Sequence, residues 1–269
     1  MSQQKPRILA GRRLLSVAIA CFLAASASAF RSVVYAQSQK SEITVSAAAS
    51  LKDVLAEIAS AFNAEQPGAA IHFNLGASGT LQQQIEQGAP VDVFISASPA
   101  QMDALAAKGL LLAGTRSDLA RNALVLIVPA AGSSVASFQD LSSTAVKVIA
   151  IGEPQTVPAG KYAQEVLTRY GLYDSLKPKF VLGKDVRQVL TYVASGNADA
   201  GLVYATDART TPEVKVAAVA PEDSHAPIVY PVAVVKDSKN PDAAKAFVGF
   251  LLSAKAQDLF KKYGFSPAR

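Results

Sequence analysis

The chain has 269 residues, of which 50% are hydrophobic and 17% are charged, and these proportions exclude wholesale disorder. Its length allows one large domain or two lobes. The net charge of +5 comes from residues 1–36, which hold five Lys or Arg residues and no acid. Subtracting these five from the 26 basic residues leaves 21 against 21 acidic residues. The rest of the chain therefore lacks the basic footprint of a nucleic-acid-binding protein.

Residues 1–36 have the order of a secretory signal peptide. Positive charges precede an uncharged apolar run, Leu14–Ala25, which is too short for a transmembrane helix of about 20 residues. Small-residue cleavage sites end at Ala29 and Ala36, and we favour Ala36 because a polar segment follows it. Cleavage there removes Cys21, and with it any disulfide or Cys-based metal site. The sequence thus predicts a periplasmic protein; twin-arginine export and lipidation at Cys21 are poorer matches.

Strands and helices are predicted to alternate along the mature chain. In the first half, the strands are 43–45, 70–75, 91–95 and 123–128, and the helices are 51–62, 81–87 and 99–108. In the second half, the strands are 146–151, 179–182, 200–204, 214–219 and 230–235, and the helices are 159–170, 186–193, 242–252 and 254–263. Such alternation indicates α/β architecture with parallel sheets. The apolar runs 123–128 and 230–235 predict two crossings between two lobes, one of residues 41–122 plus 229–269 and one of residues 123–228.

The sequence contains few candidate catalytic residues. The two histidines, His72 and His225, have no metal-like spacing, and neither can be paired with a serine from the sequence. No glycine-rich phosphate loop of the kinds found in nucleotide-binding proteins occurs. The carboxylates near loops are expected to be helix caps or surface groups: Glu153, Asp185, Asp199 and Asp207. These observations favour a binding protein over an enzyme.

Four loops of small residues each open a helix at the carboxyl end of a predicted strand. They are 47–50, 76–80, 157–160 and 184–186. A helix N-terminus presents unpaired N–H groups and a partial positive charge, so it binds an anion without Lys or Arg. Ligands of open α/β sheets lie beyond the carboxyl ends of the strands. The pattern favours an anion site between the lobes, with Ser50 and Asp53 in capping-box spacing at the first loop.

These loops resemble those of the periplasmic molybdate-binding proteins, the receptor subunits of molybdate importers. The motifs are ITVSAAASL (43–51), GASGTL (76–81), GAPVDVFISA (88–97), GEP (152–154), VPAG (157–160), DVR (185–187), GLVY (201–204), PEDSH (221–225) and YGF (263–265). They run in family order from about Glu42 to Pro267, essentially the whole mature chain. As a set they are specific, although any one alone is not.

The resemblance implies a two-lobed periplasmic-binding-protein fold of type II, α/β, in which each lobe is a mainly parallel sheet flanked by helices and the ligand cleft lies between the lobes. It implies a receptor that binds molybdate or tungstate and delivers it to the membrane permease of an ABC importer. It also implies a monomer without cofactor, catalytic activity or nucleic-acid partner.

The resemblance further implies the ligand-binding residues. They are Ser50 and Ser78, through hydroxyl and backbone N–H, Ala159 and Val186, through backbone N–H, and Tyr204, through its hydroxyl. Gly79 stands where some members carry a third small hydroxylic residue, and Ser98 where Asp is expected. Lys161 and Arg187 flank two ligand positions, and their side chains are expected to point away to the surface.

Two other functions remain open from the sequence. A binding protein for another oxyanion, such as sulfate, would use the same loops. A secreted serine hydrolase would require His72 or His225 to lie near Ser50 or Ser78.

Overall fold

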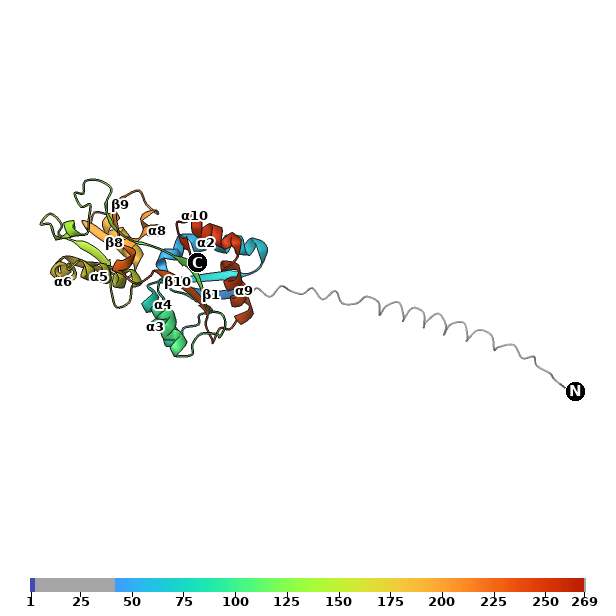
Figure 1. The fold of residues 1–269 in the computed structure, drawn as a ribbon. Coiled ribbons are helices and arrows are strands. Elements are labelled where there is room, and N and C mark those ends of the chain that lie inside the picture. The colour runs from blue at the N-terminus through green and yellow to red at the C-terminus, as the bar shows by residue number, and fades with distance from the viewer. Residues whose placement is uncertain (3–41, 269) are drawn as a thin grey trace. The chain divides into compact units, whose positions relative to one another are not determined.

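The computed structural model describes residues 1–2 and 42–268 (Figure 1). Nearly all of the predicted signal peptide, with both candidate cleavage sites and Cys21, lies outside the described residues. From Glu42 onward the described residues belong to one compact unit. Within the described part of the chain, no helix is long and apolar enough to span a lipid bilayer.

The strands fall into two separate sheets. The first has six strands in the order β11-β4-β10-β3-β1-β2 and lies within residues 41–122 and 229–269, which we call lobe one. Its strands are β1 (Glu42–Ala48), β2 (Ala70–Gly76), β3 (Val93–Ile95), β4 (Ser117–Arg121), β10 (Val229–Val234) and β11 (Ser266–Pro267).

The second sheet has five strands in the order β7-β6-β8-β5-β9 and lies within residues 123–228, which we call lobe two. Its strands are β5 (Leu124–Pro129), β6 (Ile149–Gly152), β7 (Phe180–Gly183), β8 (Ala200–Tyr204) and β9 (Val214–Val219). The two sheets agree with the predicted two-lobed α/β fold, and the lobe bounds stay a prediction.

Both sheets are mixed, and most strands of each run in one direction, which agrees with the predicted mainly parallel sheets. In lobe one, β1 pairs in parallel with β2 and β3, but β10 pairs antiparallel with β3 and β4. In lobe two, β6 pairs in parallel with β7 and β8, but β5 pairs antiparallel with β8 and β9. Strands β5 and β10 each follow a crossing between the lobes. They do not end a strand–helix–strand unit of their own sheet, so the rule for parallel crossovers does not set their direction.

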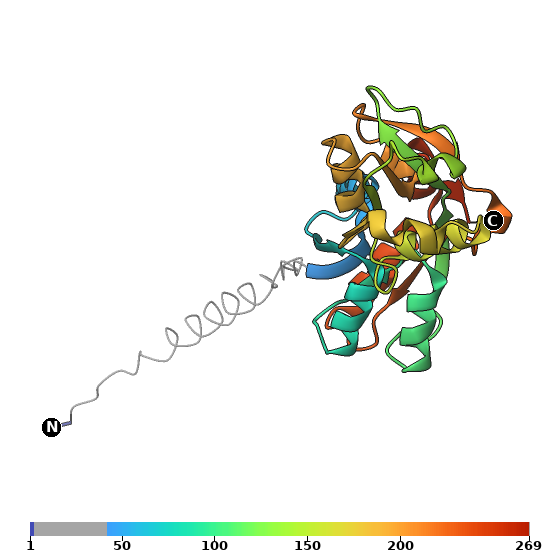
Figure 2. The same ribbon diagram turned by 90° about the vertical axis from the view of Figure 1, so that its left-hand side faces the viewer.

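Helices flank each sheet. Those of lobe one are α2 (Lys52–Glu65), α3 (Ser78–Glu86), α4 (Pro99–Ala107), α9 (Pro241–Leu251) and α10 (Ala254–Lys262), with the 3-10 turn η2 (Ala49–Leu51) before α2. Those of lobe two are α5 (Pro158–Arg169), α6 (Tyr173–Leu176), α7 (Val186–Ala194) and α8 (Ala205–Ala208), with 3-10 turns η3 (Gln139–Ser142), η4 (Lys177–Lys179) and η5 (Glu222–Ser224). Both views show α3 and α4 next to each other in lobe one (Figures 1 and 2).

Local sequence signals account for where several helices begin and end. Ser98 caps α4, since its hydroxyl accepts a hydrogen bond from the N–H of Ala100 at 3.3 Å, and Pro99 occupies the first helical position. Gly109 follows the helix with a φ of +66°, a conformation that favours glycine. The apolar stripe of α2 is buried as predicted.

One cluster of buried apolar side chains runs through both sheets. It includes Val45 of β1, Leu126 of β5 and Val203 of β8, each fully buried. The two lobes are therefore in contact in this structure, and the loops at the carboxyl ends of their parallel strands lie close together.

Candidate anion-binding site

A small cavity lies where the N-termini of helices from both lobes meet. Its lining residues are Ala48, Ala49, Ser50, Gly76, Ala77, Ser78, Ala97, Val157, Pro158, Ala159, Asp185, Val186 and Tyr204. All five ligand positions implied by the resemblance are among them, and each is no more than 4% exposed. The space open to the centre of a water-sized sphere is about 10 Å³, enough for one small species. Because sites for drug-sized ligands span roughly 300–1,000 Å³, this one suits a small ion better.

Residues at the N-termini of three helices line this cavity. Ser78 and Val186 are the first residues of α3 and α7, and Ala159 is the second residue of α5. N–H groups in the first turn have no carbonyl partner within their helix, and the helix end carries a partial positive charge. The short side chains around them leave these donors accessible to an anion.

The N-terminus of α5 packs unusually close to the end of β6. A Cβ atom at Gly160 would overlap the carbonyl group of Gly152, so only glycine allows this approach. The contact fixes the position of the neighbouring Ala159, whose N–H belongs to the candidate site.

Both serine side chains are held by specific partners. The hydroxyl of Ser78 accepts a hydrogen bond from the N–H of Ala97 at 2.9 Å. The hydroxyl of Ser50 lies 3.0 Å from that of Tyr230. The predicted capping box of Ser50 and Asp53 is wrong, because a 3-10 turn precedes α2 and neither side chain caps it.

Tyr204 contributes a hydroxyl whose bonding capacity is unused. Among the described residues, its Oη is one of few buried side-chain polar atoms without a hydrogen-bond partner. Burial raises the pKa of Tyr204 well above its usual value of 10, so the hydroxyl keeps its proton and can donate it. A buried donor without a partner is costly, so a ligand that accepts this bond is expected at the cavity.

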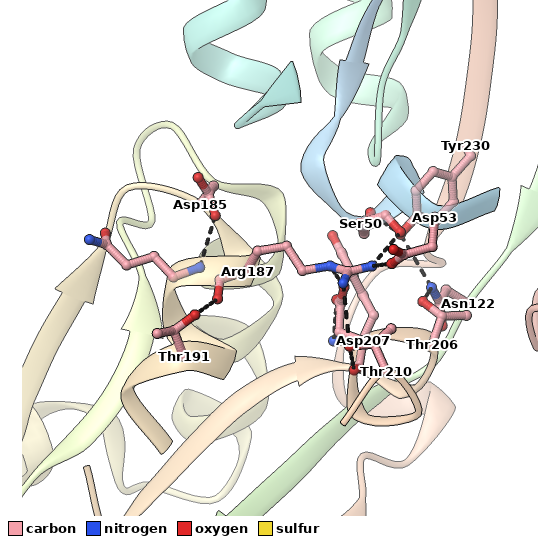
Figure 3. Close-up of polar contacts among 12 residues, drawn as sticks. Ser50, Asp53, Asn122, Asp185, Arg187, Thr191, Thr206, Asp207, Thr210 and Tyr230 are labelled. Carbon is pink, nitrogen blue, oxygen red and sulfur yellow. Dashed lines mark hydrogen bonds and ion pairs between the residues drawn. The ribbon is translucent and has the colours of Figure 1, made fainter. Parts of the chain in front are cut away.

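Arg187 does not point to the surface, which corrects the prediction from the sequence. Its side chain is only 21% exposed and forms ion pairs with Asp53 of lobe one at 2.7 Å and with Asp207 of lobe two at 2.6 Å (Figure 3). It also donates to the carbonyl of Ser50 at 3.3 Å. Arg187 thus joins the two lobes beside the cavity, while Lys161 is exposed as expected.

Asp207 is not a surface group, although it accepts the N–H of the N-cap residue of α8, as expected of a capping carboxylate. Its side chain is fully buried, and it accepts a hydrogen bond from the N–H of Tyr204 at 3.3 Å. Burial raises the pKa of Asp207 from its usual value of 3.8 to about 6, although Arg187 opposes that rise. Arg187 thus holds the carboxylate of Asp207, and that carboxylate fixes the backbone of Tyr204 through its N–H.

The other three loop carboxylates accept backbone N–H groups, as expected. Asp185 accepts from Gln188 at 2.9 Å and caps α7. Asp199 accepts from the N–H groups of Lys147 and Val148 just before β6, and Glu153 accepts from that of Gln155. Asp185 also lines the cavity, which the sequence did not indicate.

Further contacts join the lobes around the cavity. The N–H of Gly79 donates to the carbonyl of Thr156 at 2.9 Å, and the hydroxyl of Tyr162 lies 3.5 Å from the carbonyl of Ala97. A Cβ at Gly79 would come within 2.6 Å of the Thr156 oxygen, so this structure has no room there for the hydroxylic residue of some family members.

Neither histidine lines the cavity that contains Ser50 and Ser78. His72 lies in β2, where its ring is 4.0 Å from the carboxylate of Glu42. The His225 ring nitrogen lies 2.7 Å from the carbonyl of Ala226. The cavity lining, which lies wholly in the described chain, includes neither residue, and residues 42–268 hold no cluster of metal-ligating side chains. A serine hydrolase would therefore lack its base here.

Comparison with known proteins places the chain in a family. Residues 43–266 match the family model described as bacterial extracellular solute-binding protein. The chain belongs to this family. A molybdate-binding protein ModA from Haemophilus influenzae is 40% identical over 229 residues, which cover 84% of this chain and 90% of the relative. The resemblance seen in the motifs is thereby confirmed.

Solved structures of solute-binding proteins share the fold. The periplasmic molybdate-binding protein of Azotobacter vinelandii superposes with a TM-score of 0.76 at 28% identity, covering 84% of this chain and all of that one. A substrate-binding domain attributed to a molybdenum ABC transporter of Clostridium difficile has a TM-score of 0.66 and is 50% identical, covering 85% of this chain and 99% of that chain. These matches confirm the predicted two-lobed binding-protein fold.

Proposed function

We propose that this solute-binding protein is a molybdate receptor that holds the anion in the cavity between its lobes and delivers it to the permease of an ABC importer. Relatives and structural neighbours named for molybdate or molybdenum support the ligand. Tungstate, a tetrahedral dianion of similar size, is proposed as a second ligand. We further propose a periplasmic monomer, without cofactor or catalysis, that begins after Ala36.

The observation that carries this proposal is the partnerless buried hydroxyl of Tyr204 at a cavity lined by the N-terminal residues of helices α3, α5 and α7. We assign the oxyanion to the hydroxyls of Ser50, Ser78 and Tyr204 and to the N–H groups of Ala159 and Val186. Charge-assisted hydrogen bonds and helix N-termini favour a dianion there, and the neutral donors cost little to desolvate.

The division of donors between the lobes explains how binding could be signalled. Ser50 and Ser78 belong to lobe one, whereas Ala159, Val186 and Tyr204 belong to lobe two. An anion that bonds to both sets binds the closed form more tightly than any open form, and so increases its population. The closed form is the one that we propose the permease recognises.

The direct test of this function is calorimetry of the exported protein with sodium molybdate. We expect saturable binding of one anion per chain and a rise in the melting temperature when molybdate is present. Absence of both effects, or hydrolysis of ester substrates that depends on Ser50, would show that the protein has another function.

Single-residue variants should separate hydroxyl donors from backbone donors. Ser50→Ala removes a donor to a buried dianion and is expected to cost about 1.5–3 kcal/mol of binding free energy, or roughly 10- to 150-fold in affinity. Tyr204→Phe should act similarly. Val186→Ala keeps its N–H and should change affinity much less. An equal loss in Val186→Ala and Ser50→Ala, measured by calorimetry, would refute the backbone-donor assignment.

The ion pair between Asp53 and Arg187 should favour the closed form. Asp53→Asn is expected to weaken molybdate binding by about 1 kcal/mol at most, roughly five-fold, because the pair is partly exposed to solvent. Glu57→Gln is the matched control: Glu57 lies on the same helix and pairs with Lys262 within lobe one. Stopped-flow displacement should show faster dissociation for Asp53→Asn alone, and equal effects of both substitutions would rule out a role of the pair in closure.

A further inference from the structure

Tyr230 lies outside the cavity lining and links Ser50 to Asn122, which lies between β4 and β5. The side chain is 0% exposed, and the residue belongs to β10 of lobe one. Its hydroxyl lies 3.0 Å from Ser50 Oγ and 3.2 Å from Asn122 Nδ2 (Figure 3). Tyr230 does not line the cavity, so it acts on a ligand only through Ser50.

The direction of the Asn122 hydrogen bond follows from its other partners. Asn122 Oδ1 accepts a hydrogen bond from the N–H of Ala123 at 2.9 Å, which sets the orientation of the amide. The amide nitrogen must then face Tyr230 and the hydroxyl of Thr206, the latter at 2.9 Å. Because this nitrogen only donates, the Tyr230 oxygen is an acceptor in its contact with Asn122.

Ser50 Oγ is then the one acceptor among these partners for the hydroxyl proton of Tyr230. Burial holds the pKa of this hydroxyl far above its usual value of 10, so the group stays protonated. Ser50 Oγ is within hydrogen-bond distance, and a buried O–H without an acceptor would cost about 1–3 kcal/mol. Tyr230 therefore donates to Ser50, which leaves the proton of Ser50 free to point into the cavity.

Ser78, like Ser50, accepts a hydrogen bond at its hydroxyl oxygen, but its donor is a backbone N–H. Its oxygen accepts the N–H of Ala97, so its proton is also free for the cavity. Both serines thus face the cavity as donors. The N–H of Ala97 cannot be removed by substitution, whereas the Tyr230 hydroxyl can.

We propose that Asn122 and Tyr230 are positioning residues that fix Ser50 as a hydrogen-bond donor and so select oxyanions that carry no proton. This inference rests on the proposed molybdate site. A protonated oxyanion needs an acceptor for its O–H. Ser50 Oγ has two acceptor lone pairs, and the Tyr230 proton occupies one of them while the proton of Ser50 is directed at the ligand. Removing the Tyr230 hydroxyl should therefore relax selectivity against protonated anions.

Arsenate and selenate provide a test in which size is held nearly constant. Both are tetrahedral anions of similar bond length, but near pH 7 arsenate carries at least one proton and selenate none. We compare wild type, Tyr230→Phe and Tyr162→Phe by competition calorimetry, displacing molybdate with each anion at up to tens of millimolar. Tyr162→Phe is the matched control, because its buried hydroxyl lies near the cleft but faces the Ala97 carbonyl instead of a ligand serine.

In wild type and Tyr162→Phe, selenate should displace molybdate at least ten-fold better than arsenate. In Tyr230→Phe, arsenate should gain at least ten-fold relative to selenate. A ratio in Tyr230→Phe equal to that of wild type, or no displacement by either anion, overturns the inference. Failure of the wild type to bind molybdate would instead refute the proposed function and this inference with it. Should Tyr230→Phe not fold, Asn122→Ala, which also frees Tyr230 to accept from Ser50, must shift the ratio in the same direction.

Discussion

Replacing Gly160 with alanine is expected to destabilise the protein by about 3 kcal/mol and to weaken molybdate binding at least ten-fold. The added Cβ would overlap the carbonyl group of Gly152, and both clashing partners are backbone, which cannot rotate away. The N-terminus of α5 must therefore move off β6. That movement displaces the N–H of Ala159, one of the donors that we assign to the anion.

The control for this substitution is Gly249→Ala in helix α9. A Cβ at Gly249 meets no atom within 4 Å, and alanine is the better helix former, so Gly249→Ala should be neutral or stabilising. Chemical denaturation and calorimetry of both variants measure stability and affinity separately. Normal molybdate affinity in a Gly160→Ala protein would show that the Ala159 N–H is not part of the site.

Discrimination among tetrahedral anions is the second large effect that we expect. Molybdate and tungstate should bind tightly and comparably, sulfate at least 100-fold more weakly, and phosphate not measurably. Phosphate near pH 7 carries at least one P–OH. The groups that we assign to the anion all serve as donors, so that proton has no acceptor among them, which costs about 1–3 kcal/mol in addition to any misfit of size.

Sulfate carries no proton, so its rejection must come from size. Its bonds are shorter than those of molybdate, and its oxygens would lie short of donors spaced for the larger anion, so several hydrogen bonds would be stretched together. Calorimetry with the four anions at equal ionic strength measures the order. Phosphate binding as tight as that of molybdate would mean that an acceptor serves the cavity, and Asp185, which lines it, is the residue to test first.

The loops that carry four of the ligand positions could be predicted because their signal is local, whereas the individual ligand residues came from the family resemblance. Ser78, Ala159 and Val186 each open a helix after a strand, and a loop of small residues marks that place in the sequence. Once the strands are parallel, their carboxyl ends meet at one edge, and the helix N-termini come together. Residues of all four predicted loops line the cavity, in agreement with this reasoning.

The residues behind the site could not be predicted, because their partners are distant in the chain. Arg187 contacts Asp53, 134 positions away, and Tyr230 contacts Ser50, 180 positions away. The sequence around an arginine does not show whether its side chain lies on the surface or forms ion pairs between two lobes. A signal for Tyr230 did exist, since a tyrosine in an apolar strand run must find a partner for its hydroxyl, but the sequence does not say which.

The antiparallel strands within the mainly parallel sheets could not be predicted, for a similar reason. Alternation of strands and helices predicts parallel sheets, but β5 and β10 enter their sheets after crossing between lobes. Their apolar runs look like those of any strand buried on both faces. Only the path of the whole chain determines that they run antiparallel.

The most direct test of the proposed site is a crystal structure of the molybdate complex, with data collected at the molybdenum absorption edge. A single anomalous peak should lie in the cavity between the lobes, with oxygens about 2.7–3.2 Å from the hydroxyls of Ser50, Ser78 and Tyr204 and from the amide nitrogens of Ala159 and Val186. A molybdenum peak elsewhere on the protein, with this cavity filled by water alone, would contradict the account.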